Sequence, residues 1–164
     1  MGCGKSTHGK KLAKVLRRTF IDLDVYISKE EGISVEEIFA EKGEDYFRQK
    51  ESDNLNKINN QTSKLVISLG GGTVCFNNNL NKILNAGLVI YIKMPAEALH
   101  KRLINSKTQR PLLQNKNSEE SLEYIKKLLE KREQFYNKAH LTINGIDLTT
   151  DKLKEAVSLF IAKH

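Results

Sequence analysis

The sequence predicts an α/β fold in which helices cover both faces of a parallel sheet. Two continuous apolar runs, 65–69 and 88–92, are typical of parallel strands that are buried on both faces. Amphipathic helical stretches alternate with such runs along the whole chain, as they do in βα repeats. A Gly-Lys-Ser-Thr segment at 4–7 opens the first helical stretch, which is typical of phosphate-binding loops. We therefore expect a three-layer α/β/α fold of the P-loop type.

The remaining elements follow from the same patterns. Ser34 and Glu37 form a capping box, in which each side chain accepts from the other residue's backbone N–H, so we expect a helix to begin there. Pro95 suits the first turn of another helix. The predicted helices lie at about 5–16, 43–59, 95–103, 118–137 and 151–162, and the predicted strands at about 20–23, 65–69, 88–92 and 141–143.

Composition indicates a single globular domain over residues 1–164, with a polar loop at about 105–117. Hydrophobic residues make up 39% of the chain and charged residues 29%. No apolar run approaches the roughly 20 residues that a membrane span needs. Cys3 and Cys75 are too few for a disulfide scaffold and fit a reducing cytoplasm. The net charge is +7, and the lysines and arginines are mostly scattered among glutamates. This pattern favours a pocket for anions over nucleic-acid binding.

The segment from Gly2 to Thr7 is predicted to bind a nucleoside triphosphate. It matches the end of the motif G-x-x-x-x-G-K-[ST], with Gly2, Cys3 and Gly4 before the lysine. In this motif backbone N–H groups surround the phosphates, Lys5 reaches the outer phosphates, and the Ser6 hydroxyl binds Mg²⁺. Thr7 completes the match.

The start of this motif departs from the pattern. Its first glycine would lie two positions before Met1, and no strand precedes the loop in the sequence. In doubly wound folds that strand is central to the sheet. We therefore expect the first strand to be missing, and our hypothesis is that the natural chain begins roughly ten residues earlier, which is enough for one strand.

Asp22 and Asp24 follow the short apolar run at 20–21. Alternation along a strand would place both carboxylates on one face at its carboxyl end, where ligands bind in open α/β sheets. One acid could support Mg²⁺ and the other could accept the proton of an attacking hydroxyl. The alternative is an acidic pair at the start of the next helix.

These motifs together resemble those of shikimate kinases. The resemblance implies that Asp24 binds the shikimate hydroxyls and is the catalytic base, and that Asp22 supports Mg²⁺. Residues 43–51 are similar to the family's segment G-E-x-x-F-R-x-x-E. This similarity implies that Arg48 binds the substrate carboxylate, that Glu51 orients Arg48, and that Phe47 forms a wall of the substrate pocket. The alternative for Arg48 and Glu51 is a solvated charge pair on a helix.

Three further segments extend the resemblance. Gly70, Gly71 and Gly72 match a triple glycine that touches the substrate; the alternative is a tight turn. Arg110 matches the arginine of an R-P-L lid that covers the nucleotide, although the same residues would also suit an ordinary surface loop. Arg132 lies four residues before a tyrosine, as does a family arginine that binds the substrate carboxylate. Three of the six arginines thus fall where the family has one.

The implied activity is the transfer of a phosphoryl group from ATP to the 3-hydroxyl of shikimate. Lys5, Arg110 and Mg²⁺ would spread the charge of the transition state. The resemblance also implies a cytoplasmic monomer whose partners are small molecules. The rival readings are another kinase of this fold, such as gluconate kinase, a nucleotide-binding module without activity, and a basic nucleic-acid-binding protein.

Overall fold

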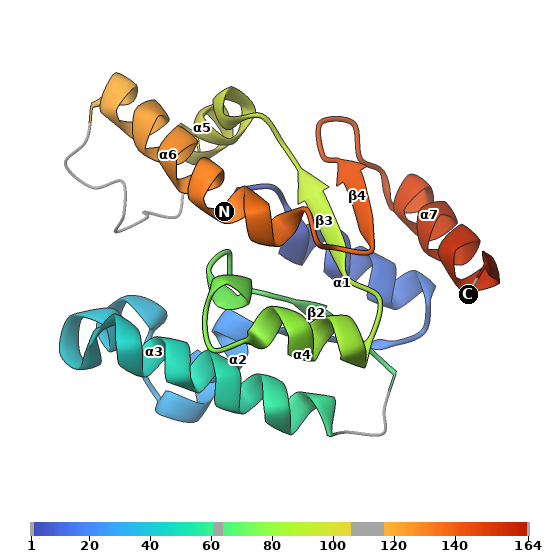
Figure 1. Ribbon diagram of the computed structural model, residues 1–164, viewed down its shortest axis with the longest axis horizontal. Coiled ribbons are helices and arrows are strands. Elements are labelled where there is room, and N and C mark those ends of the chain that lie inside the picture. Colours follow the sequence, from blue (N-terminus) through green and yellow to red (C-terminus); the bar gives the residue numbers. More distant parts are fainter. Residues whose placement is uncertain (1, 61–63, 106–116, 164) are drawn as a thin grey trace.

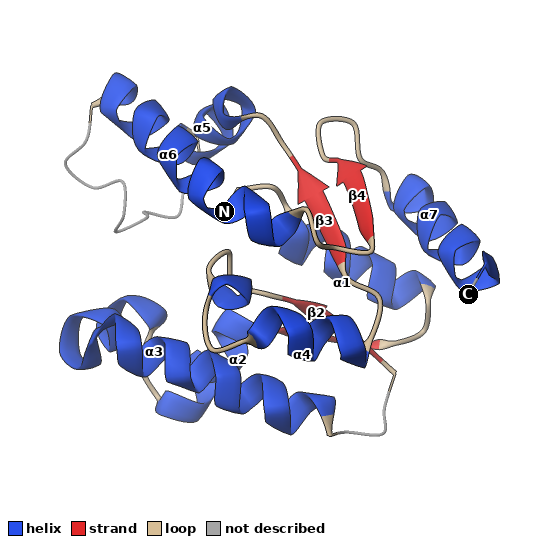
Figure 2. Cartoon of the chain, in the orientation of Figure 1, coloured by secondary structure: helices blue, strands red, loops and turns tan. Residues whose placement is uncertain are grey.

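The structure is a computed structural model and describes residues 2–60, 64–105 and 117–163 (Figure 1). Its secondary structure alternates between helices and short strands (Figure 2). The elements are, in order, α1 (Lys5–Val15), β1 (Thr19–Asp22), α2 (Leu23–Glu31), α3 (Val35–Asn59), β2 (Leu65–Ser68), the short 3₁₀-helix η1 (Thr73–Cys75), α4 (Asn79–Ala86), β3 (Ile90–Lys93), α5 (Ala96–Ile104), α6 (Ser118–Tyr136), β4 (Leu141–Asn144) and α7 (Thr150–Lys163). None of the helices within those ranges combines the length and the apolar character that crossing a membrane requires.

The strands pair in parallel, as predicted. β1 lies beside β2, with Thr19 opposite Leu65, and β3 lies beside β4, with Ile90 opposite Leu141. Within the described ranges these are two separate two-stranded sheets, β1-β2 and β3-β4, and no strand joins them. The parallel α/β architecture is therefore confirmed, but its sheet is divided into two halves.

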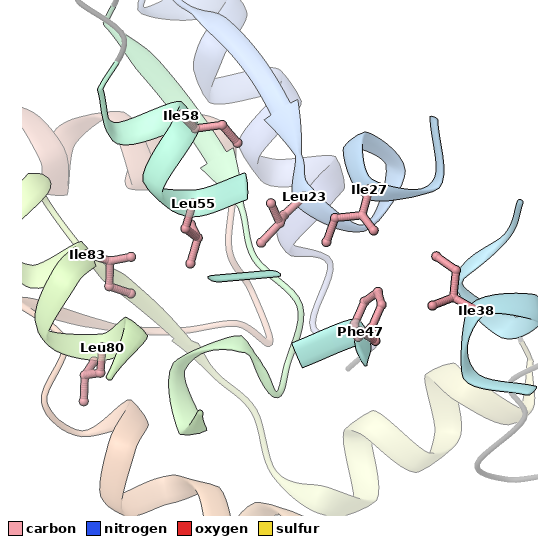
Figure 3. Close-up of a cluster of buried hydrophobic side chains, with 8 residues drawn as sticks. All are labelled: Leu23, Ile27, Ile38, Phe47, Leu55, Ile58, Leu80 and Ile83. Atoms are coloured by element: carbon pink, nitrogen blue, oxygen red, sulfur yellow. The ribbon is translucent and has the colours of Figure 1, made fainter. Parts of the chain in front are cut away.

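The helices bury three groups of apolar side chains around these halves. The largest holds α2, α3 and α4 together, with Leu23, Ile27, Leu55 and Ile58 almost fully buried (Figure 3). A second group lies between α5 and α6 and includes Ile125. The third joins α1 to α7. The β1-β2 half therefore shares its core with α2, α3 and α4.

The capping box at the start of α3 is confirmed. Ser34 Oγ accepts from the backbone N–H of Glu37, and the Glu37 carboxylate accepts from the N–H of Ser34. Ile33 and Ile38 pack in the same cluster, as expected of the residues that flank such a cap. The helix then runs on to Asn59 through Gly43, whose φ of 82° interrupts the helical backbone. The helix predicted at 43–59 is the part beyond this kink.

The expectation that 65–69 is a fully buried strand is wrong in this structure. Leu65, Val66 and Ile67 are only half-buried, and Ser68 is the buried residue of β2. The physical reason is that, among the residues that the structure describes, β2 has a strand on one side only. Its other side faces a cavity of about 580 Å³ that separates it from β3.

The interpretation of Asp22 and Asp24 as two residues of one strand is also wrong. β1 ends at Asp22, and Leu23 begins α2 with a side chain that is fully buried. Asp24 therefore lies in the first turn of a helix. A carboxylate in this position interacts favourably with the helix dipole. Both acids therefore still lie at the carboxyl end of β1, Asp22 as the last residue of the strand and Asp24 in the first turn of α2.

Candidate active site

The loop before α1 is built to bind an anion. Gly2 and Gly4 have φ values of 72° and 84°, which strain any residue with a side chain, and Gly4 is the N-cap of α1. Lys5 is the first residue of the helix. The backbone N–H groups of the loop and the positive end of the helix dipole are therefore available to a phosphate group bound at the start of α1.

Ser6 connects this loop to the ends of two strands. Its hydroxyl donates to Asp22 Oδ2 at 2.5 Å, and its oxygen lies 3.1 Å from Ser68 Oγ. One carboxylate and two hydroxyls are thus gathered beside the phosphate loop. Within the described residues no cluster of three or more histidines, cysteines and acids could hold a metal ion. Such a sparse set of oxygens suits Mg²⁺, which keeps several waters and takes phosphate oxygens as ligands.

Arg48 is held rigidly on α3. Its Nη1 donates to Glu51 Oε2 at 2.6 Å, while its Nη2 and Nε donate to Glu44 Oε1 at 2.8 and 3.1 Å. The guanidinium lies 4.6 Å from the centre of the Phe76 ring. Only 8% of the residue is exposed, so the solvated charge pair considered as an alternative does not describe Arg48.

Glu51 lies at the centre of this network. It is fully buried, and Thr73 donates its hydroxyl to Glu51 Oε1 while Arg48 binds the other oxygen. Burial raises the pKa of Glu51, although these hydrogen bonds oppose the rise, and the nearby Asp24 carboxylate adds to it. The two acids are therefore close enough for their charges to interact.

The triple glycine turns tightly around these side chains. A β-carbon on Gly70 would lie 2.7 Å from Glu51 Oε1 and 2.9 Å from Asp24 Oδ1. A β-carbon on Gly72 would lie 2.7 Å from Arg48 Nη2 and 2.8 Å from its Cζ. All four distances are too short for a β-carbon. Gly70 and Gly72 are therefore required by the packing of the protein's own charged side chains, in addition to any contact that they make with a substrate.

The middle glycine is fixed by α6. Tyr136 donates its hydroxyl to the carbonyl oxygen of Gly71 at 2.5 Å, and its ring packs against Tyr91. Arg132 precedes Tyr136 by one helical turn. Burial raises the pKa of the Cys75 thiol, and the positive charges of Arg132 and Arg48 oppose that rise. Both arginines therefore lie near η1, where the triple glycine ends.

Most of the predicted site residues lie around one region. Lys5, Gly70, Gly71 and Arg132 line the cavity between the two sheet halves. Phe47 is 3% exposed and packs against Phe39 beside the Arg48 guanidinium, so it forms part of the core beneath the site. Arg110 and the predicted lid at about 105–117 lie outside the described residues, apart from 105 and 117.

Arg102 was not predicted from the sequence as a residue of the site. This α5 residue donates to the carbonyl oxygens of Cys3 and Gly145, each at 3.4 Å, and to Met94 Sδ at 3.2 Å. A positive charge is thereby placed beside the phosphate loop and beside the turn after β4. The only signal in the sequence was that Arg102 is one of six arginines in a lysine-rich chain.

A family model, curated relatives and the more similar of the solved structures point to one family. A model of the shikimate kinase family matches residues 1–162. A shikimate kinase of Parabacteroides distasonis is 40% identical over 151 residues, which are 92% of this chain and 87% of that protein. The crystal structure of shikimate kinase from Bacteroides thetaiotaomicron superposes with a TM-score of 0.91 at 35% identity, covering 96% of this chain and 94% of the other. Shikimate kinase from Acinetobacter baumannii in complex with shikimate gives a TM-score of 0.86 at 34% identity, covering 99% and 89%.

Proposed function

The chain belongs to the shikimate kinase family, and we propose that its site phosphorylates the 3-hydroxyl of shikimate with ATP, using the residues described above. One observation carries the assignment of roles. Asp24, Arg48 and Arg132 come from three different helices, and all lie around the triple glycine beside the phosphate loop. A carboxylate that accepts a proton and two arginines suit an acceptor that carries both hydroxyl groups and a carboxylate.

Arg48 would bind the carboxylate of shikimate. Its bonds to Glu44 and Glu51 use three of the five N–H groups of a guanidinium and leave one on each terminal nitrogen. Two donors on adjacent nitrogens match the two oxygens of a carboxylate. Because Glu51 and Glu44 hold the side chain, little rotamer entropy is lost on binding. Arg132 would add the second positive charge.

Asp24 would orient the attacking hydroxyl and accept its proton. It lies at the start of α2, and its Oδ1 is close to Gly70, on the side where the phosphate loop lies. Lys5 and the backbone N–H groups of Gly2, Cys3 and Gly4 would bind the phosphates of ATP. Thr7, in the first turn of α1, would belong to the same ATP-binding segment. Phosphoryl transfer depends chiefly on such positioning and charge stabilisation.

Ser6 and Asp22 are the residues that would hold Mg²⁺. Their oxygens already lie within 2.5 Å of each other, and hard oxygen ligands are those that this ion prefers. The bound ion would neutralise charge on the outer phosphates. The role of Arg110 above the transferring phosphoryl group stays a proposal from the family resemblance. The expectations of a single domain and of a cytoplasmic monomer without nucleic-acid or membrane partners likewise stay predictions.

The decisive test is ADP release from Mg-ATP with and without shikimate, with gluconate as the alternative acceptor. Turnover that requires shikimate is expected, whereas equal turnover with gluconate would contradict the proposal.

The role of Asp24 is tested by Asp24→Asn. We expect kcat to fall about 100-fold or more with a much smaller change in KM, because a general base acts in the transition state. The matched control is Asp45→Asn, at an exposed position on α3. A raised KM with unchanged kcat would instead assign Asp24 to binding alone.

A further inference from the structure

We propose that Thr73 is a positioning residue of the acceptor site. Its buried hydroxyl holds the Glu51 carboxylate as the charged partner of Arg48, so that Arg48 is fixed for the carboxylate of the acceptor. This role rests on the proposed function, because it concerns how tightly the same site holds shikimate.

Thr73 is held in place by its own backbone. It is the first residue of η1 and is fully buried. Its N–H donates to the carbonyl oxygen of Gly70 at 3.3 Å, and its carbonyl oxygen accepts from Nδ2 of the buried Asn79 at 3.0 Å. Threonine is branched at the β-carbon and has few rotamers. The position of the hydroxyl is therefore set independently of Glu51, to which it donates.

Glu51 has two donors within the part of the chain that the structure describes. Its Oε2 accepts from Arg48 Nη1 at 2.6 Å, and its Oε1 accepts from the Thr73 hydroxyl. None of the Glu51 side chain is exposed, so bulk water does not replace either donor. A buried carboxylate oxygen that loses its donor is unstable, and the group then takes up a proton or turns away. Loss of the Thr73 hydroxyl should therefore act on Glu51 and, through Glu51, on Arg48.

The place of this hydroxyl is crowded with acidic oxygens. A β-carbon on Gly70 would lie 2.7 Å from Glu51 Oε1 and 2.9 Å from both Asp24 Oδ1 and Thr73 Oγ1. The three oxygens therefore surround one point. Two negative charges so close together favour the uptake of a proton by one of them, and a hydrogen bond to the charged form opposes this uptake.

The charge of Glu51 therefore depends on its neighbours. Burial raises the pKa of Glu51, the hydrogen bonds from Thr73 and then from Arg48 lower it, and the charge of Asp24 raises it. The Cys75 thiol is also near: its pKa is raised by burial and, to a smaller degree, by the charge of Glu51. Without the Thr73 hydroxyl the pKa of Glu51 should rise further. Because the protonated form dominates below the pKa, Arg48 would lose its charged partner as the pH falls.

The test is Thr73→Val, since valine has the shape of threonine without the hydroxyl. We expect the KM for shikimate to rise roughly tenfold at about pH 7, while kcat and the KM for ATP change much less. The rise should be larger at about pH 6 and smaller at about pH 9, where Glu51 regains its charge. Thr73→Ser keeps the hydroxyl and should retain the KM of the unmodified chain. Thr142→Val is the matched control, because it makes the same change at an exposed position on β4.

A second measurement does not depend on catalysis. Carbon-13 NMR follows the ionisation of the Glu51 carboxyl group, whose signal is identified by its loss in Glu51→Gln. We expect this group to titrate at a higher pH in Thr73→Val than in the unmodified chain. If the unmodified chain does not phosphorylate shikimate, the proposed function fails, whereas the effect of Thr73 on Glu51 is still decided by this titration. If Thr73→Val does not fold, Thr73→Ala is measured in the same two ways.

Three results would overturn the proposal. They are an unchanged KM for shikimate in Thr73→Val at every pH, an equal loss in Thr73→Ser, and a raised KM that does not vary with pH while Glu51 titrates as before. The last result would show that Thr73 shapes the turn after the triple glycine without acting through Glu51.

Discussion

Gly72 has a backbone conformation that any residue can adopt, with φ of −95° and ψ of −18°, so its neighbours must explain why a glycine lies there. The reason is Arg48, whose guanidinium occupies the place where a β-carbon would be. Arg48 cannot easily move aside because Glu44 and Glu51 hold it. The glycine and the arginine therefore form one structural unit, and a change at one should be seen in the function of the other.

We predict that Gly72→Ala raises KM for shikimate roughly tenfold, because displacing Arg48 weakens a hydrogen bond to a charged group, while kcat changes less. Steady-state kinetics with varied shikimate measure this. The matched control is Gly87→Ala, since the Gly87 backbone is extended and an added β-carbon would meet no atom within 4 Å. Unchanged KM in Gly72→Ala would show that Arg48 does not bind the substrate.

Contacts between site residues that are close together in the sequence could be predicted, and contacts between residues far apart in the sequence could not. Arg48 and Glu51 are one helical turn apart, so their spacing in the sequence already placed them together. Thr73 reaches Glu51 across 22 positions, and Tyr136 reaches Gly71 across 65. No local pattern contains such pairs, because they exist only after the helices pack. Arg102, which reaches Cys3 across 99 positions, was missed for the same reason.

At the scale of elements, Glu31 joins α2 to α3. Its carboxylate binds Lys42 at 2.8 Å and Lys50 at 2.7 Å, and it accepts from the Tyr46 hydroxyl at 2.8 Å. The hydrogen bond from Lys42, followed by those from Lys50 and Tyr46, lowers the pKa of Glu31 to about 2 from an ordinary value of 4.5. A carboxyl whose pKa is lowered by folding stabilises the protein above pH 4.5, and this contribution is lost as the pH falls toward 2.

We predict that Glu31→Gln lowers the free energy of unfolding by on the order of 1 kcal/mol at about pH 7, as expected for ion pairs at the protein surface. The difference from the unmodified chain should shrink as the pH falls below 4.5. Urea unfolding at several pH values measures it. Glu30→Gln is the matched control, because the Glu30–Lys57 pair is more exposed and lies 3.2 Å apart. A difference that stays constant with pH would contradict the prediction.

Helix boundaries with strong capping signals were predicted well, and short elements were not. The Ser34 capping box fixed the start of α3, and α1 begins at Lys5 as expected. By contrast, a helix after Asp22 entered only as the alternative for the acidic pair, because Asp22, Leu23 and Asp24 alternate like a strand. The decisive feature was the burial of Leu23 against the core, which a single sequence does not reveal. The eight-residue α4 was missed because its periodic pattern is too short to be distinguished from a loop.

For the molecule as a whole, the sequence predicted the family and the parallel architecture, while in the structure the strands of the described ranges form two pairs, β1-β2 and β3-β4. The same division separates the groups of the site. Asp24 and Arg48 belong to the helices packed on the β1-β2 half, whereas Arg132 lies on α6, which packs on α5 and reaches the core of the β1-β2 half only near its end, through Phe135. Among the described residues, the hydrogen bond from the Tyr136 hydroxyl to the carbonyl oxygen of Gly71 links α6 to the triple glycine. A ligand that binds both groups should therefore stabilise the two parts together.

We predict that saturating shikimate raises Tm of the chain by roughly 5–10 °C, because a ligand at 100 times its Kd contributes about 2.7 kcal/mol. Arg132→Ala should lose most of this shift, since the substrate would then contact only the helices on the β1-β2 half. Lys131→Ala is the matched control, because it removes a positive charge from an exposed position one residue away. Thermal unfolding with increasing shikimate measures all three proteins. An equal shift in Arg132→Ala would place shikimate wholly on the β1-β2 side and remove Arg132 from the binding site.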